Sequence, residues 1–434
     1  MSVTLPDLKE SALWLDDVSA WAAGDVVRLP ASVDVMIIGA GYTGLNAALE
    51  CARGGLSTLL IDSGVPGAGC STKNGGQIST SVKPSLDALS AKFGGDRARA
   101  IRAEGANALQ WIESRIRDEK IDCDFQRCGR FHAAHTPAHF QELLRDVDAL
   151  CEEGIDVHAV SSAEQREELG TDAYHGGLVF TQHASLHPAR YHRGLLERAC
   201  EAGACVVSEC AALKIERKTT GFDVTTERGM TRAENVIVAT NGYTGSVTPW
   251  LQRRAIPIGS YIIATEPLPP EQMDRLFPKN RIVSDTCKVV YYYRASTDRK
   301  RIVFGGRVSS GEIDHKLSAQ RLQQQMCRLF PELRDVAITH SWSGKVAYSF
   351  DERAHTGVHE GVHYAMCYCG SGVSMASYLG MRLGQKVLGL ELGVTAFDDL
   401  PFPTRPLYKG RPWFLPPVVA WYRLRDRWET RQYA

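Results

Sequence analysis

The sequence lacks the features that mark three classes of protein. It has no net charge, because 50 Lys and Arg residues balance 50 Asp and Glu residues, whereas a protein that binds mainly nucleic acid needs a basic surface. No run approaches the roughly 18 consecutive apolar residues of a membrane-spanning helix. The N-terminal residues contain neither the basic nor the apolar segment of a signal peptide. We therefore expect a cytoplasmic protein with no integral membrane segment and no nucleic-acid partner.

Cysteine is present but without a pattern. The 12 cysteines are scattered along the chain, with no C-x-x-C and no paired Cys/His spacing of the zinc type. Most are expected to be small buried apolar residues, and the sequence predicts no metal site. The 434 residues, 44% of them hydrophobic and 23% charged, have the composition of a folded protein of two or three domains.

The first chemical signal is a glycine-rich turn between two buried strands. Residues 33–39 and 57–62 have the β-branched and apolar character of strands, and residues 45–49 favour a helix. The turn Gly39-Ala-Gly41-Tyr42-Thr43-Gly44 is a G-x-G-x-x-G in the required βαβ context. Its glycines allow close approach of a pyrophosphate to the helix N-terminus, and Asp62 can accept hydrogen bonds from a ribose. This pattern predicts a dinucleotide, either FAD or NAD.

Two further glycine clusters lengthen the predicted cofactor site. Residues 67–78 form a second glycine-rich loop directly after Asp62, and Gly370-Ser371-Gly372 stands between a strand and a helix. A cofactor that extends past its pyrophosphate needs such an additional cradle. Beyond the first turn, the predicted cofactor-binding residues are Asp62, Ser63, Ser71, Asn74, Gly75, Gly76, Gln77, Thr240, Asn241, Gly370, Ser371, Gly372 and Val373.

Together the three glycine clusters resemble the D-amino-acid-oxidase-like superfamily of FAD oxidoreductases, the glycine/sarcosine oxidase group. Residues 71–77 (STKNGGQ) and 368–373 (YCGSGV) are similar to blocks of gamma-glutamylputrescine oxidase-like proteins, and the resemblance covers residues 30–395. The chain has Ser371 where that pattern has His, and Lys73 and Lys345 where it has Arg. No cysteine aligns with the position of covalent attachment in some relatives, so the resemblance implies non-covalent FAD.

The resemblance also implies a reaction and a fold. An amine would transfer hydride from its α-carbon to flavin N5, and water would hydrolyse the resulting imine, with O2 or another acceptor reoxidising the flavin. The expected fold is α/β, a Rossmann-type FAD-binding domain interleaved with an antiparallel-sheet (α+β) substrate domain. The predicted boundaries are 30–90, 150–245 and 355–395 for the FAD-binding domain, 91–149 and 246–354 for the substrate domain, 1–29 for an N-terminal extension and 396–434 for a tail.

Substrate contacts are expected from the antiparallel domain, over the flavin. Lys345, in a W-x-G-K segment, is predicted to stabilise negative charge on the reduced flavin, with a solvated lysine on a loop as the alternative. Tyr293 and Tyr291 share one strand face and predict either an aromatic wall around an amine or cross-strand packing. Arg307 is predicted to pair with a substrate carboxylate, with a surface arginine as the alternative. The predicted catalytic residues are Lys345, Tyr293 and Arg307, and the predicted substrate-binding residues are Tyr261, Tyr291 and Trp342.

Three alternatives remain open from the sequence. A related flavoenzyme could oxidise the C–OH bond of a 2-hydroxyacid, a flavoprotein subunit could pass electrons to a partner, and an NAD dehydrogenase would use the other dinucleotide. The aromatic and basic tail either docks on its own protein or contacts a membrane surface or a partner.

Overall fold

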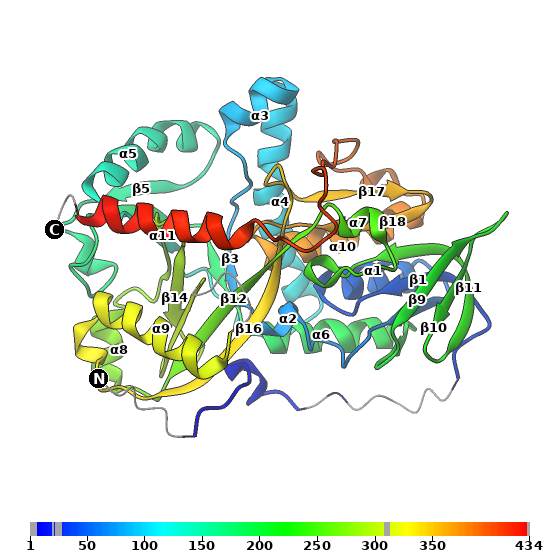
Figure 1. The fold of residues 1–434 in the computed structure, drawn as a ribbon, viewed down its shortest axis with the longest axis horizontal. Coiled ribbons are helices and arrows are strands. Elements are labelled where there is room, and N and C mark those ends of the chain that lie inside the picture. The colour runs from blue at the N-terminus through cyan, green and yellow to red at the C-terminus, as the bar shows by residue number, and fades with distance from the viewer. Residues whose placement is uncertain (1–6, 20, 22–27, 308–312, 432–434) are drawn as a thin grey trace.

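The computed structural model describes residues 7–19, 21, 28–307 and 313–431. Residues 1–6, 20 and 22–27 of the predicted N-terminal extension, and 432–434 of the predicted tail, lie outside these ranges. Figure 1 shows two sheets along the long axis, with helices packed around both. Within the described ranges, no helix is long and apolar enough to cross a membrane.

The first sheet is a parallel sheet extended at one edge. Its strands run in the order β17-β18-β11-β1-β2-β8, and all neighbours pair in parallel except β17 with β18. Their bounds are β1 (Ser32–Ile38), β2 (Thr58–Ile61), β8 (Cys205–Val207), β11 (Gly229–Val238), β17 (His355–His359) and β18 (Val362–Met366). Two antiparallel strands, β9 (Ala212–Arg217) and β10 (Phe222–Thr226), extend from β11. The order 3-2-1-4 of β8, β2, β1 and β11 is that of a dinucleotide-binding fold.

Helices and a second layer of strands bury the two faces of this sheet. Apolar side chains of β1 and β2 alternate between the two cores, because successive strand residues point to opposite faces. On one face pack α1 (Tyr42–Arg53), α4 (Gly95–Asp118), α6 (Pro188–Glu201) and α10 (Gly372–Val387), with α3 (Leu86–Phe93) beside α4. On the other face, Phe222 and Val224 of β10 pack against β1 and β11. The parallel strands are therefore buried on both faces, which explains their continuous apolar sequence.

The second sheet is almost entirely antiparallel, as predicted. Its order is β16-β12-β15-β14-β13-β4-β6-β5, and only β13 and β4 pair in parallel. The bounds are β4 (Arg130–Ala133), β5 (Val157–Val160), β6 (Gly177–Phe180), β12 (Ile256–Thr265), β13 (Ile282–Asp285), β14 (Tyr291–Ala295), β15 (Ile302–Gly306) and β16 (Ile338–Tyr348). The helices α5 (Pro137–Glu152), α8 (Pro270–Leu276) and α9 (His315–Leu329) lie around it, and α7 (Pro249–Gln252) precedes β12. A two-stranded sheet pairs β3 (Gln77–Ile78) with β7 (Ala184–Ser185).

The structure differs from the predicted boundaries at two places. Strands β5 and β6 pair with the second sheet, although the predicted boundaries place residues 150–245 in the FAD-binding domain. Helix α4 packs against α10 in the core of the first sheet, although the predicted boundaries place residues 91–149 in the substrate domain. Strand pairing and the apolar stripe of a helix decide these memberships, and neither is visible in the local composition.

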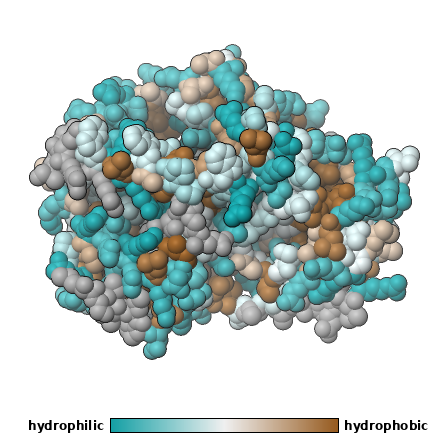
Figure 2. All heavy atoms as spheres, in the orientation of Figure 1, coloured by the Kyte–Doolittle hydropathy of each residue, from teal (hydrophilic) through white to brown (hydrophobic). Residues whose placement is uncertain are grey.

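The tail folds back onto the protein. Residues 415–431 form α11 (Leu415–Arg431), which crosses in front of the second sheet (Figure 1). Asp426 accepts hydrogen bonds from the backbone N–H groups of Lys288 (2.9 Å) and Val289 (3.1 Å), and Arg423 donates to the carbonyl of Arg307 (3.1 Å). The visible face in Figure 2 is mainly hydrophilic, with hydrophobic side chains in small separate groups. Trp421, Leu424 and Trp428 of α11 are exposed; their contact with a membrane or partner stays a prediction.

Candidate active site

The first glycine turn lets α1 approach the ends of β1 and β11. Gly39 has a φ of +110°, and a Cβ atom there would lie 2.8 Å from the carbonyl oxygen of Ala239. A Cβ atom at Gly44 would lie 1.9 Å from the carbonyl oxygen of Gly39. Both positions therefore exclude any side chain, because the neighbouring atoms belong to the backbone.

The N-terminus of α1 is left without a side-chain cap. Gly41 occupies the N-cap position, and the N–H of Tyr42 donates to a side chain, the hydroxyl of Ser71 at 3.0 Å. Tyr42 is itself fixed by a hydrogen bond from its hydroxyl to the carbonyl of Pro188 (3.1 Å), and the Thr43 hydroxyl lies 2.6 Å from the hydroxyl of Tyr368. A rigid, uncapped helix start presents N–H groups and the positive end of the helix dipole to an anion.

Asp62 lies at the end of β2, beside this helix start. Its carboxylate accepts hydrogen bonds from the N–H groups of Ala40 (2.8 Å) and Gly64 (2.9 Å). Burial raises the pKa of Asp62, and the two backbone hydrogen bonds oppose that rise. The neighbouring Ser63 is exposed. The carboxylate is thus held beside the helix start, and its contact with a ribose stays a prediction.

Asn74 shapes the second glycine-rich loop, which contains the short helix α2 (Cys70–Lys73). Its side-chain amide donates to the carbonyls of Cys70 (3.1 Å) and Ser71 (2.9 Å), and its oxygen accepts from the N–H of Gly76 (2.8 Å). Gly76 has a φ of +65°, and a Cβ atom there would lie 2.2 Å from a backbone oxygen. Gln77 then donates to the carbonyl of Tyr293 at 3.2 Å, so the loop is tied to the second sheet.

Two tryptophans hold this loop from the side of the second sheet. Trp342, predicted to contact substrate, is 1% exposed and donates its indole N–H to the carbonyl of Lys73 (3.0 Å). Trp14, which the sequence did not single out, donates in the same way to the carbonyl of Asn74 (2.8 Å). The two rings are edge to face at 6.5 Å. Trp342 therefore packs against the loop and supports its backbone.

The third glycine cluster forms the start of α10, which packs directly against α1. Ser371 occupies its N-cap position, but the Ser371 hydroxyl donates to the carbonyl of Ser81 (2.7 Å) and does not cap the helix. A Cβ atom at Gly372 would meet nothing within 4 Å, while Val373 is buried. A second uncapped helix start therefore borders open space.

Thr240 and Asn241 close the site at the end of β11. The Asn241 side chain accepts a hydrogen bond from the N–H of Cys367 (2.9 Å), and the hydroxyls of Thr240 and Thr244 lie 2.7 Å apart. Asn241 begins a short 3-10 helix, η3 (Asn241–Tyr243), that leads to the second sheet. The glycine clusters, the two helix starts and Asp62 fit an extended dinucleotide such as FAD.

Comparison with known proteins agrees with this geometry. The family described as "FAD dependent oxidoreductase" (DAO) matches residues 34–386. The chain belongs to this family. It is 32% identical to "Probable oxidoreductase OrdL" of Rhizobium meliloti, over 91% of this chain and 92% of that one, and 28% identical to "Gamma-glutamylputrescine oxidoreductase" of Escherichia coli, over 96% and 98%. The glycine oxidase structure from Geobacillus kaustophilus superimposes with a TM-score of 0.71 at 19% identity, covering 87% of this chain and 99% of that one.

The family match establishes the protein as an FAD-dependent oxidoreductase, and the prediction of its cofactor and enzyme class is confirmed. The α/β fold with its second, antiparallel sheet is confirmed by the structural likeness. The roles of individual site residues stay predictions, and the contacts described here show which of them the fold brings toward the glycine clusters.

The second sheet turns two different faces to its surroundings. Tyr261, Tyr291 and Tyr293 point to the face covered by α9, where they pack with Phe304 and Phe330. Tyr293 is 0% exposed, and its hydroxyl donates to that of Tyr174 (3.2 Å). The hydroxyl of Tyr261 accepts from the N–H of Ile313 (2.8 Å). Tyr291 and Tyr293 stack on Phe304 of the neighbouring strand, which is the cross-strand packing that stands as one of the two alternatives for this pair.

The opposite face looks toward the nucleotide-binding domain. Tyr292 points there, because its neighbours on β14 point the other way, and its hydroxyl lies 2.8 Å from that of Ser260. Its ring lies 3.3 Å from the position a Cβ atom would take at Gly75. Tyr348 of β16 has its hydroxyl 3.5 Å from the corresponding position at Gly370. Neither Tyr292 nor Tyr348 is among the residues that the sequence predicts at the site, although strict alternation along residues 291–293 places Tyr292 on the face opposite to Tyr291 and Tyr293.

Arg307 shares this inner face. It follows Gly306, which pairs with Tyr261, so alternation points its side chain away from the tyrosine core. Burial lowers the pKa of its guanidinium, and Tyr348 interacts with it electrostatically. Among the described residues, its buried Nε has no hydrogen-bond partner. Arg307 is therefore a partly buried cation that lies near Tyr348 and near Arg423 of α11.

Lys345 lies where β16 meets η3. Its N–H donates to the hydroxyl of Tyr243 (3.3 Å), and its Nζ lies 5.9 Å from the centre of the Tyr243 ring. Tyr243 in turn packs on Gly69, at the start of α2, with its ring 3.2 Å from a Cβ position there. The exposed Lys345 side chain thus stands at the junction of the two domains.

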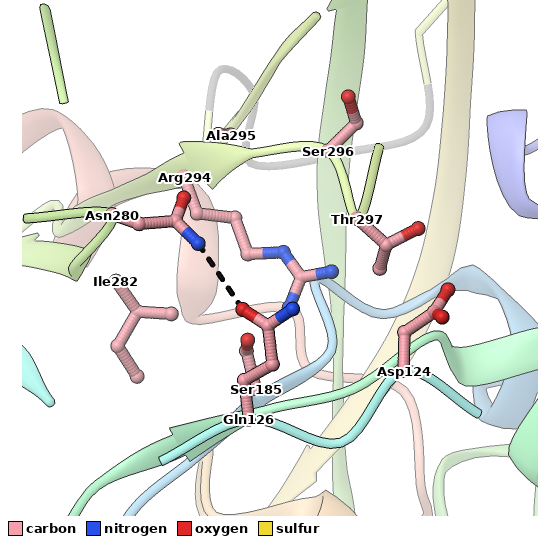
Figure 3. Close-up of a pocket in the computed structure, with 9 residues that line it drawn as sticks. All are labelled: Asp124, Gln126, Ser185, Asn280, Ile282, Arg294, Ala295, Ser296 and Thr297. Atoms are coloured by element: carbon pink, nitrogen blue, oxygen red, sulfur yellow. Dashed lines mark hydrogen bonds between the residues drawn. The ribbon is translucent and has the colours of Figure 1, made fainter. Parts of the chain in front are cut away.

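A small polar pocket lies on another side of the glycine loop (Figure 3). Arg294 lines this pocket and is 3% exposed. Its guanidinium donates hydrogen bonds to the carbonyls of Gly76 (3.2 Å) and Leu186 (3.0 Å). The amide of Asn280 donates to the side chain of Gln126 across the same pocket (3.2 Å). These groups support the loop and we assign them no further role.

Proposed function

We propose that the protein oxidises the C–N bond of a small amine or N-substituted amino acid that carries a carboxylate, a gamma-glutamylputrescine-like substrate. The observation that carries the proposal is Arg307, a partly buried cation whose Nε has no hydrogen-bond partner among the described residues, on the face turned to the nucleotide-binding domain. A guanidinium in this state is suited to a bidentate pair with a carboxylate. The likeness to a protein named for gamma-glutamylputrescine supports the same class.

The other residues on this face complete the proposed site. Tyr292 and Tyr348 supply an aromatic wall that excludes water and holds the substrate carbon chain. Burial raises the pKa of the Tyr348 hydroxyl to about 12, so this group stays protonated and can donate a hydrogen bond. Bound FAD supplies the hydride acceptor for the amine. The positive end of the α10 dipole and the Lys345 ammonium would favour negative charge on the bound cofactor.

The thiols near the site favour a non-covalent cofactor. Cys70 and Cys369 are the cysteines nearest to the second and third glycine clusters. Burial raises the pKa of each thiol to about 11, so neither is a ready nucleophile. We therefore propose non-covalent FAD, with O2 or another acceptor reoxidising it, and the cytoplasmic location stays a prediction.

Anaerobic mixing of the FAD-loaded protein with a substrate panel tests the proposal. The panel holds γ-glutamyl amines, N-methyl amino acids, the same amines without a carboxylate, and 2-hydroxyacids; the readout is loss of the flavin band at about 450 nm. We expect bleaching by carboxylate-bearing amines, with a carbonyl product. Bleaching by hydroxyacids alone would place the protein with C–OH oxidants. Absence of bleaching by any member, in protein that dithionite reduces, would favour an electron-transfer subunit.

A further inference from the structure

Three side chains that the sequence scatters meet at one point between α5 and α11. His135 lies just before α5, His139 lies in its first turn, and Glu429 lies near the end of α11. Their possible ligand atoms all lie within 4.8 Å of one another. The three residues have no part in the nucleotide site described above.

Both imidazole rings are held by the same kind of neighbour. The Nδ1 of His135 lies 2.7 Å from the hydroxyl of Thr286, which also accepts from the His135 backbone N–H at 3.1 Å. The Nδ1 of His139 lies 2.7 Å from the hydroxyl of Thr136, which accepts from the His139 backbone N–H at 3.2 Å. In the tautomer with hydrogen on Nδ1, each threonine fixes its ring and leaves the Nε2 lone pair available. Metal-binding histidines are oriented in this manner.

The facing atoms of this cluster are buried and make no hydrogen bond to any residue that the structure describes. Among the described residues, neither the Nε2 of His135 nor the Oε2 of Glu429 makes a hydrogen bond, and the two atoms lie 3.7 Å apart. The His135 side chain is 7% exposed and that of Glu429 is 15% exposed. The other carboxylate oxygen of Glu429 accepts from Arg425 at 2.6 Å, which orients the carboxylate. Buried polar atoms without partners are costly, and a cation between them would satisfy both.

We propose that His135, His139 and Glu429 bind a divalent transition-metal ion, for which Zn²⁺ is the probe, with water completing the coordination. Two imidazoles and one carboxylate are a ligand set that zinc accepts. Ligand atoms around a tetrahedral zinc ion lie about 3.3 Å apart, given bond lengths of about 2.0–2.1 Å. The three ligand atoms, which lie within 4.8 Å of one another, would have to approach one another to about this distance when the ion binds. The sequence predicts no metal site because the prediction considers residues that are close together in the chain. Glu429 lies in the tail, far from His135 and His139 in the sequence.

The metal would fasten α11 to the second sheet. Asp426, one turn before Glu429, already accepts from the backbone at Lys288 and Val289, and Arg423 donates to the carbonyl of Arg307. Metal binding at Glu429 adds a third attachment to the same helix. We therefore expect Zn²⁺ to slow hydrogen exchange along α11 (Leu415–Arg431).

The test compares zinc binding by the FAD-loaded wild-type protein with that of single variants. After chelation and dialysis against Zn²⁺, we expect wild type to retain one more zinc per chain than His139→Gln or Glu429→Gln. Loss of one ligand should weaken zinc affinity at least about 10-fold. His158→Gln is the matched control, because His158 is exposed on β5. All variants keep the 12 cysteines, so the difference reports on the altered ligand alone.

Two further readouts make the result decisive. X-ray absorption at the zinc edge should show nitrogen and oxygen neighbours, and a shell of sulfur at about 2.3 Å would mean binding by cysteine instead. Hydrogen exchange of α11 should slow on adding Zn²⁺ to wild type and to His158→Gln, but not to the two ligand variants. Equal zinc content in wild type and ligand variants that retain their flavin would overturn the proposal.

Discussion

The glycine turns of the first sheet and the tyrosine-bearing strands of the second sheet place their residues by different rules. At the glycine turns, each residue acts through its own backbone: Gly44 is needed because a carbonyl oxygen stands where its Cβ would be. On the second sheet, a side chain's surroundings depend on which face it takes. Tyr293 is buried in an apolar core, whereas its neighbour Tyr292 faces the nucleotide-binding domain. Two adjacent residues of one strand can therefore differ completely in role, one packed in the core and the next a candidate site contact.

Substitution at Gly44 tests the first rule and should have the largest effect. Gly44→Val places a Cβ atom 1.9 Å from the carbonyl oxygen of Gly39, so α1 must move away from the end of β1. We expect the purified variant to retain no flavin, because the turn and the helix start can no longer approach a pyrophosphate. Flavin released from the protein and measured per chain reports the result.

Gly245→Ala is the control for this experiment, since a Cβ atom there meets nothing within 4 Å. It should retain flavin as wild type does. Wild-type flavin content in Gly44→Val would show that the close approach at this turn is not required for the cofactor.

Removal of the Tyr293 side chain tests the packed face of the second sheet. Tyr293→Ala should lower the free energy of unfolding by about 3–5 kcal/mol, the usual cost of deleting a buried aromatic ring. Tyr293→Phe removes only the hydrogen bond to Tyr174 and should cost about 1 kcal/mol. Denaturant unfolding measures both changes.

Activity separates the two faces more sharply than stability. Tyr293→Phe should keep the wild-type kcat/KM, whereas Tyr292→Phe, which loses its contact with Ser260, should lower it. Equal losses of kcat/KM in the two variants would contradict the division of the sheet into a packed face and a site face.

The sequence predicts the first sheet more completely than the second for a physical reason. The βαβ unit, the glycine turn and Asp62 are contiguous, so local pattern and backbone sterics suffice. On the second sheet, the sequence predicts the strands and a common face for Tyr291 and Tyr293, but period-two alternation does not reveal which face turns toward the nucleotide-binding domain. Trp342 was expected to touch substrate, and its bond to the carbonyl of Lys73 depends on a loop far away in the chain.

Arg307 tests the site face directly. Arg307→Lys keeps the charge but loses the planar pair of donors. We expect kcat/KM for a carboxylate-bearing amine to fall on the order of 100-fold, as for a lost hydrogen bond between charged groups. The same amine without its carboxylate should be oxidised equally by variant and wild type. Steady-state kinetics with both amines measures the difference.

Arg328→Lys serves as the control, because Arg328 is exposed on α9. It should change neither rate. A similar fall for both amines in Arg307→Lys would mean that Arg307 acts on the geometry of the site and not on the carboxylate.

The smallest expected effect returns to the glycine turn and concerns pH. The Nε2 of the buried His192 lies 2.8 Å from the carbonyl oxygen of Ala40, and burial lowers the pKa of His192 from 6.5 to about 4. The folded protein therefore holds His192 neutral while the unfolded chain takes up a proton below about pH 6.5. Stability from this group is complete above that pH and is lost as pH falls toward 4. Between pH 7 and 5 the loss should be about 2 kcal/mol. Urea unfolding at the two pH values should show a loss of stability in wild type and in His158→Gln that is about 2 kcal/mol larger than the loss in His192→Gln, whose amide can still donate to Ala40. An unchanged difference in His192→Gln would assign the acid sensitivity to other buried histidines, and the neutral imidazole under the turn would then contribute nothing to it.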